Sequence, residues 1–113
     1  MELNEIAQNI VKIIFEEKDK TILILTHDSM FRRKTLEYIV REIEHPSFQF
    51  KKIDYGSSRI DDDNRNRIFV VSINSPGELD RIRALRSDYV FKDWLVEDEM
   101  NKWEYIKMII TRT

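Results

Sequence analysis

The sequence contains no cysteine, and this absence excludes several kinds of functional site at once. Zinc fingers, dithiol redox pairs, thiol nucleophiles and disulfide scaffolds all depend on cysteine. Only two histidines occur in 113 residues, so Asp and Glu would have to supply most ligands of any metal site. We therefore expect neither a bound metal nor a cofactor.

Glycine is scarce as well. Gly56 and Gly77 are the two glycines of the chain, whereas average usage is about 7%. The phosphate-binding patterns G-x-x-x-x-G-K-S/T and G-x-G-x-x-G cannot be built from these two positions. Glycine-rich loops that cradle a nucleotide phosphate are therefore excluded.

Long apolar runs are missing too. No run approaches the ~20 residues that a membrane-spanning helix needs. Residues 1–5 have neither the basic end nor the apolar stretch of a signal peptide. We expect a cytoplasmic protein that has no contact with a membrane.

The residues that are present are those of a globular domain. Apolar side chains make up 42% of the chain and charged side chains 35%, with a net charge of −2. A chain of this size buries roughly two-thirds of the surface that its unfolded form exposes, so it can hold a core without disulfides or a metal. We expect one domain over residues 1–113.

The first part of the chain predicts a helix, a buried strand and a second helix. Apolar residues recur at steps of three and four over residues 3–17, which is typical of an amphipathic helix. The apolar run over residues 21–26 is typical of a strand buried on both faces of a parallel sheet. Capping oxygens of Asp28 or Ser29 begin a helix over residues 29–44, which Pro46 stops.

The middle of the chain predicts two more strands and a third helix. Residues 48–53 alternate between apolar and polar, apart from one doubled polar position, which indicates a half-exposed strand near the sheet edge. Residues 55–66 are polar and are predicted to form a loop or a hairpin connection, and residues 68–73 a second buried strand. A capping box at residues 75–78 begins a helix that ends near Arg86.

The last part predicts a short buried strand over residues 89–91, a weaker helix over 96–102 and a final strand over 105–110. Alternation of helices and strands is typical of α/β folds. We therefore predict a three-layer α/β sandwich with a mostly parallel sheet of four to five strands.

Polar residues gather at the predicted carboxyl ends of the strands, where an open parallel sheet binds its ligands. These residues are Thr26, His27, Asp28, Ser29, Asn74, Ser75 and Asp93. Helix N-termini near Ser29 and Pro76 would offer unpaired backbone N–H groups to an anion there. Capping and turn formation explain the same residues, so both interpretations stay open.

Two short runs of residues contain the residue types of a hydrolase triad and of a calcium site, but their spacing supports neither. His27, Asp28 and Ser29 contain the residue types of a hydrolase triad, but adjacent side chains point in different directions. The run Asp61, Asp62 and Asp63 lacks the alternating spacing of a calcium loop, so a solvated turn is the better interpretation.

Basic and aromatic residues provide candidates for an interaction surface. Three basic clusters are Arg32, Arg33 and Lys34; Arg59, Arg65 and Arg67; and Arg81, Arg83 and Arg86. They would suit a phosphate backbone, but acidic residues lie among them, the net charge is negative and no aromatic ladder is present. Aromatic anchors are common at interface hot spots, although both tryptophans would also fit a core role. The candidate interaction residues are Trp94, Trp103, Tyr105, Arg32, Arg33, Arg83 and Arg86.

The order of the predicted elements resembles the ATPase core of phage large terminases and, more distantly, helicase-like P-loop NTPases. Residues 21–26 and 29–44 resemble a strand and helix of that core. Residues 81–93, RIRALRSDYVFKD, resemble the segment that leads into the Walker B strand, and residues 108–111 the strand of the coupling motif. The resemblance implies a RecA-like topology, a viral protein of the host cytoplasm or virion, and a water-mediated Mg²⁺ role for Asp93.

The chain departs from that family at the residues that perform catalysis. No Walker A loop is present, and residues 28–35, DSMFRRKT, share only its final Lys-Thr. Asp93 is followed by Trp94 where the family has Asp-Glu, and Ala84 replaces a usual glycine. Phosphoryl transfer relies on positioning and neutralising phosphates, so these departures argue against an enzyme.

We therefore expect a non-catalytic accessory module, a degenerate relative of a packaging ATPase, that acts by contact with a protein partner. One alternative is a nucleic-acid-binding accessory protein that uses the arginine clusters. Another is an enzyme or sensor that binds a nucleotide or small anion at the carboxyl edge of the sheet.

Overall fold

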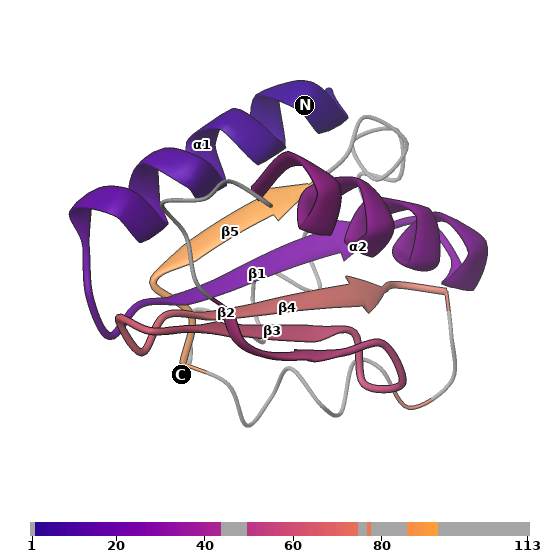
Figure 1. Cartoon of the computed structure of the whole chain (residues 1–113). Helices are drawn as coiled ribbons and strands as arrows, with labels where there is room; N and C mark the ends of the chain where they lie inside the picture. Colours follow the sequence, from indigo (N-terminus) through magenta and orange to yellow (C-terminus); the bar gives the residue numbers. More distant parts are fainter. Residues whose placement is uncertain (1, 44–49, 75–76, 78–85, 93–113) are drawn as a thin grey trace.

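A computed structural model describes residues 2–43, 50–74, 77 and 86–92 of the chain (Figure 1). These residues form two helices and one five-stranded sheet, which confirms the predicted α/β class. Neither of the two helices is long and apolar enough to cross a membrane. The elements in chain order are α1 (Leu3–Glu16), β1 (Thr21–Thr26), α2 (Ser29–Ile43), β2 (Phe50–Asp54), β3 (Arg59–Asp62), β4 (Arg67–Ser72) and β5 (Tyr89–Lys92).

The sheet is mixed, with the strand order β2-β3-β4-β1-β5. β1 pairs in parallel with β4 on one side and with β5 on the other. β3 pairs antiparallel with both β2 and β4. The predicted mostly parallel sheet was wrong, because residues 55–66 contain a strand of their own rather than a simple connection.

Both helices lie on the same face of the sheet, which we call the helix face (Figure 1). The apolar stripe of α1 and that of α2 pack together over alternate residues of the strands, as the helical and strand periodicities require. The resulting core excludes water almost completely. It consists of Ile6, Ile10, Ile13, Ile14, Ile22, Ile24, Leu36, Ile39, Val40, Ile43, Ile60, Ile68 and Val70.

The opposite face of the sheet, which we call the second face, changes character from one side to the other. Near β1 and β4 it carries Leu23, Leu25 and Val71, all fully buried. Near β2 and β3 it carries charged side chains instead. Of the predicted helix over 75–86 the structure describes only Gly77, whose φ of +80° is not helical, and Arg86. The predicted helix over 96–102 and the predicted strand over 105–110 lie outside the described residues, so the described fold comprises one helical layer and the sheet.

An irregularity in β2 explains the doubled polar position in the sequence. The register between β2 and β3 shifts between Phe50 and Lys52, which marks a β-bulge. The additional residue lets Ile53 pack against the core on the helix face, while Lys52 lies opposite Asp61. The predicted edge position of this strand is confirmed, because β2 is at one end of the sheet order.

Candidate functional site

The carboxyl ends of β1 and β4 bring Thr26, His27 and Asn74 together, as the parallel pairing requires. The backbone N–H of Ile73 donates to the Thr26 carbonyl at 2.9 Å, and Asn74 Nδ2 donates to the His27 carbonyl at 2.8 Å. Thr26 is buried, and its Oγ1 donates to the Val71 carbonyl at 3.0 Å. These contacts close the end of the sheet.

Asp28 forms the cap of α2. Its Oδ1 accepts a hydrogen bond from the Phe31 backbone N–H at 3.0 Å, and its Oδ2 lies 3.2 Å from His27 Nδ1. The Phe31 N–H is the main cause that lowers the pKa of Asp28, and His27 lowers it further. The ionised carboxylate therefore occupies the helix N-terminus, where an incoming anion would have to bind. Ser29, the first residue of the helix, is exposed.

The other candidates from the sequence do not join this edge within the described part of the chain. Arg32 and Arg33 lie on α2, where Arg32 is half-buried and exposed Arg33 contacts Glu37 at 3.4 Å. Arg86 is exposed. The predicted site residues Ser75, Asp93, Arg83, Trp94, Trp103 and Tyr105 lie outside the described residues.

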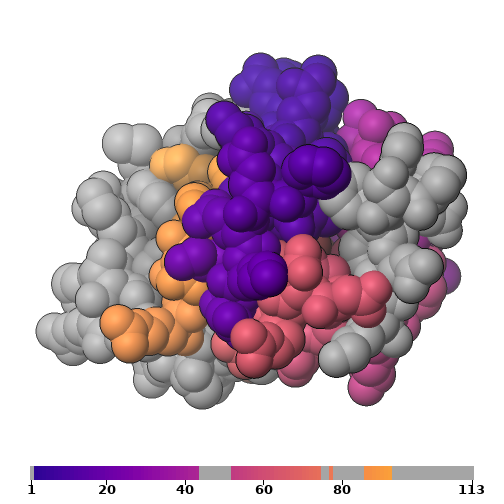
Figure 2. Space-filling model, turned by 60° about the vertical axis from the view of Figure 1, so that its left-hand side comes forward, coloured from indigo at the N-terminus to yellow at the C-terminus, as the bar shows by residue number. Residues whose placement is uncertain are grey.

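At the opposite end of the sheet, buried Asp62 and Asn66 form a brace between distant segments. Asp62 Oδ1 accepts the backbone N–H groups of Asn64 and Asn66, at 2.9 and 2.8 Å. The Asn66 side chain donates to Asp62 Oδ2 and to the Glu17 carbonyl, and it accepts from the Lys20 N–H at 2.9 Å. The β3–β4 turn is thereby fixed against the connection from α1 to β1, where coral and purple surfaces meet in Figure 2.

The brace also settles the role of the acidic run at residues 61–63. Asp62 is buried and organises the turn, whereas Asp63 is exposed. Among the described residues, no group of three His, Asp or Glu side chains is arranged to hold a metal ion. The run is therefore part of a strand and its turn, rather than the solvated turn alone that the sequence predicted.

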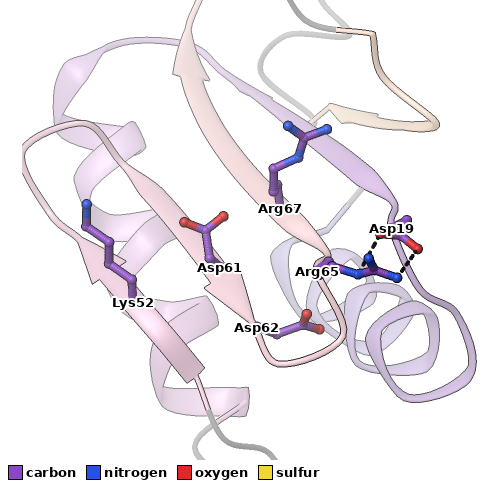
Figure 3. Close-up of a pocket in the computed structure, with 6 residues that line it drawn as sticks. All are labelled: Asp19, Lys52, Asp61, Asp62, Arg65 and Arg67. Carbon is purple, nitrogen blue, oxygen red and sulfur yellow. Dashed lines mark hydrogen bonds and ion pairs between the residues drawn. The ribbon is translucent and has the colours of Figure 1, made fainter.

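A cavity of about 560 Å³ lies beside this brace (Figure 3). Sequence reasoning missed it, because its residues come from β2, β3, β4 and the connections between elements. The clustering of Arg59, Arg65 and Arg67 near the acidic run was the only sequence signal for it. In the part of the chain that the structure describes, the charged residues that line the cavity are Asp19, Lys52, Asp61, Asp62, Arg65 and Arg67.

Three of these residues form a row across neighbouring strands. Lys52 of β2 is the cross-strand partner of Asp61 in β3, and Asp61 is the partner of Arg67 in β4. We call Lys52, Asp61 and Arg67 the charged row. Figure 3 shows their side chains on the same side of the sheet, with Asp61 between the two cations.

The remaining contacts show which charged side chains of the cavity already have an ion-pair partner. Arg59 binds both carboxylate oxygens of Asp61 at 3.0 to 3.1 Å, and its guanidinium lies 5.0 Å from the Phe69 ring centroid. Arg65 pairs with Asp19 at 2.9 Å. Arg67 donates from Nη2 to Thr21 Oγ1 at 2.9 Å. No ion pair to Lys52 or Arg67 occurs within the described residues.

A second cavity, of about 370 Å³, lies between α1 and β5, which meet at one side of the molecule (Figure 2). The Tyr89 hydroxyl at its wall donates to the Glu17 carboxylate. This hydrogen bond is the main cause that raises the pKa of Tyr89, and burial and nearby acidic groups add to it. Tyr89 is therefore a neutral donor that joins β5 to the end of α1.

Comparisons of the chain with models of protein families, with curated proteins and with solved structures found no match.

Proposed function

We propose that this chain is a non-catalytic module that acts by binding a protein partner. The lining of the larger cavity carries the proposal: among the described residues, three cationic and three acidic side chains lie around a volume of about 560 Å³ at the surface of the sheet. Mixed charges of this kind give a protein contact its specificity and orientation.

The carboxylates of that cavity are already used in structural contacts. Asp19 pairs with Arg65, Asp61 with Arg59, and Asp62 with backbone N–H groups of its own turn. A general base needs a carboxylate that can reach and take a proton from a substrate. The arrangement favours recognition over catalysis.

The two alternative functions fit the described surface less well. A nucleic acid would meet acidic side chains among the arginines, since Arg59 and Arg65 are each paired with an aspartate. A nucleotide or small anion at the carboxyl edge would meet the ionised Asp28 carboxylate at the N-terminus of α2.

A relation to packaging-motor ATPases is the evolutionary part of the proposal. The three adjacent parallel strands β4, β1 and β5 support a RecA-like origin, and the antiparallel strand β3 is a departure from it. A degenerate relative would act on a protein of the same viral assembly, in the host cytoplasm or the virion. The Mg²⁺ role that the resemblance implies for Asp93 concerns a residue outside the described part of the chain.

Affinity capture followed by reconstitution tests the proposed function. The tagged chain is used as bait in an extract of the cells in which the protein naturally occurs. Each retained protein is then purified and titrated against the chain by calorimetry. We expect one protein to bind directly with a fixed stoichiometry.

Two parallel measurements can each yield a result that contradicts this function. The first is a titration with a short DNA duplex, whose binding would fall steeply with salt if the arginine clusters contact phosphates. The second is thermal unfolding with millimolar ATP or GTP and Mg²⁺, in which a rise in Tm would report nucleotide binding. If either measurement is positive and no direct protein partner is found, the corresponding alternative function replaces the proposal.

A further inference from the structure

We infer that the charged row is the contact point for the partner, and that it binds a carboxylate on an acidic segment of that protein. This inference rests on the proposed function and specifies its chemistry. Lys52 and Arg67 would hold the carboxylate between them, above Asp61, at the cavity in Figure 3.

The register of the sheet sets the distance between the two cations. Asp61 is the direct cross-strand partner of both Lys52 and Arg67, so β2 and β4 are separated by one strand. Two strand spacings place the backbones of the two cations roughly 10 Å apart. Long lysine and arginine side chains that project from the same side can both reach a group held between them.

The charge between these cations is already neutralised. Arg59 takes both oxygens of Asp61, whose side chain is only 20% exposed, and Phe69 supports the guanidinium from below. The charged row together with Arg59 therefore has three cations and one carboxylate. An additional carboxylate would reduce this excess from two positive charges to one, and charge-assisted hydrogen bonds to it would be among the stronger polar contacts.

The fold sets the strand position of Lys52 and orients the guanidinium of Arg67. The β-bulge between Phe50 and Lys52 sets the strand position that puts Lys52 opposite Asp61. The bond from Arg67 Nη2 to Thr21 Oγ1 fixes one side of that guanidinium and leaves its other N–H groups to a ligand. Because the Arg67 guanidinium is oriented beforehand, less of its side-chain freedom is lost on binding.

The surroundings favour an acidic peptide over a polyanion. Asp19 and Asp62 line the same cavity, and Asp54 lies opposite Arg59 on the neighbouring strands. A single carboxylate between Lys52 and Arg67 would not contact these three aspartates. A run of phosphates would extend over them. The chemistry therefore points to an isolated Glu or Asp of a partner segment.

A titration followed by NMR tests the site. The uniformly ¹⁵N-labelled chain is titrated with a capped Gly-Ser peptide that contains two glutamates, and with the same peptide in which both are glutamine. We expect the glutamate peptide to shift backbone amides around positions 52, 61 and 67. Lys52→Gln and Arg67→Gln should each weaken its binding about 3- to 10-fold. The matched controls Lys34→Gln and Arg41→Gln, both exposed on α2, should leave it unchanged.

Other outcomes would overturn the inference. Equal shifts with the glutamine peptide, or no loss in the two variants, would mean that the row does not bind a carboxylate. Stronger shifts of the same amides with an oligothymidylate would assign the row to nucleic acid. If a captured partner binds Lys52→Gln and Arg67→Gln as tightly as the unaltered chain, the proposed function stands while this site fails. If the glutamate peptide binds at the row but no direct partner exists, the site stands and the proposed function fails.

Discussion

The two faces of the sheet use the same strands for opposite purposes. In β4, Ile68 and Val70 point into the core on the helix face, whereas Arg67 and Phe69 point to the second face. The helix face is apolar from β3 to β1 and is fully buried. The second face is apolar near β1 but becomes charged towards β2.

This difference separates the residues that stabilise the fold from those available for recognition. Full burial of an isoleucine contributes about 1.5–3 kcal/mol, whereas an exposed ion pair contributes about 0–1 kcal/mol. Charges in the outer half of the second face can therefore change with little effect on stability. Selection for binding is free to act there, while the helix face is constrained by packing.

The largest effect should come from the helix face. Ile24→Ala leaves a cavity in the middle of β1, where Ile24 is fully buried, and should lower the free energy of unfolding by about 2–5 kcal/mol. Val90→Ala, at a half-buried position on the second face of β5, should cost less than about half as much. Urea denaturation followed by circular dichroism measures both. Equal losses would remove the distinction between the faces.

The brace beneath the charged row should give the next largest effect. Asn66→Ala removes bonds to Lys20, Glu17 and Asp62 and leaves their buried or half-buried polar groups unsatisfied, at a cost of about 2–3 kcal/mol. Asn64→Ala loses one longer bond, to the Ile14 carbonyl at 3.3 Å, and should cost about 1 kcal/mol or less. The same urea measurement would contradict this order if Asn64→Ala proved the more damaging change.

Lowering the pH should reduce the stability that carboxylates in turns and helix caps contribute, and should leave the contribution of the apolar core unchanged. Backbone N–H groups of Phe31 and Ser57 lower the pKa values of Asp28 and Asp54, respectively, below 3.8. The unfolded chain then binds more protons, so the stability from both groups is present above about pH 4 and is lost as pH falls through the folded pKa values.

Replacing the two aspartates by asparagine tests this explanation. Asparagine keeps an oxygen that accepts the hydrogen bond, but it is not protonated in the acidic pH range. The double variant Asp28→Asn with Asp54→Asn should lose less stability than the unaltered chain between about pH 5 and pH 2.5. Unfolding free energies measured across this range would show it. A slope identical to that of the unaltered chain would mean that other carboxylates control acid unfolding.

The smallest effects should come from the charged side of the second face. Arg59→Gln breaks a partly exposed ion pair and a cation–π contact and should cost about 1 kcal/mol or less. Lys52→Gln and Arg67→Gln should each change stability by less than about 0.5 kcal/mol, although we expect both to weaken peptide binding. Thermal unfolding monitors all three variants. A loss of several kcal/mol in Lys52→Gln or Arg67→Gln would indicate a structural role instead.

Sequence patterns identified the elements whose burial is either periodic or continuous. The continuous apolar run predicted β1 at its observed bounds, and the helical stripes predicted α1 and α2 to within a residue or two at their ends. β3 was missed because Ile60 is its one apolar residue, so four positions offered no visible alternation. Its pairing depends on neighbours in β2 and β4, and a linear pattern contains no information about them.

The site was harder to predict for a related reason. Residues at the carboxyl ends of strands are recognised by position, and Thr26, His27 and Asn74 do lie together. The cavity and its charged row exist only after β3 has paired on both sides, which brings Lys52 and Arg67 across from Asp61. Without β3 in the prediction, Arg67 belonged to a basic cluster and Asp61 to the acidic run, and Lys52 belonged to neither.

The mixed topology of the sheet also bears on how the chain folds. The antiparallel strands β2, β3 and β4 follow one another through short turns, whereas β1 and β4 join residues 46 positions apart, such as Thr21 and Arg67. Closing the long loop costs more entropy, so we expect the three-stranded meander to form early and β1 to join it later. Pulsed hydrogen exchange would show amides of β3 protected before those of β1, and the reverse order would refute this sequence of events. On this order of events, folding begins at the strands that carry the charged row, and β1, which lies between β4 and β5, joins them later.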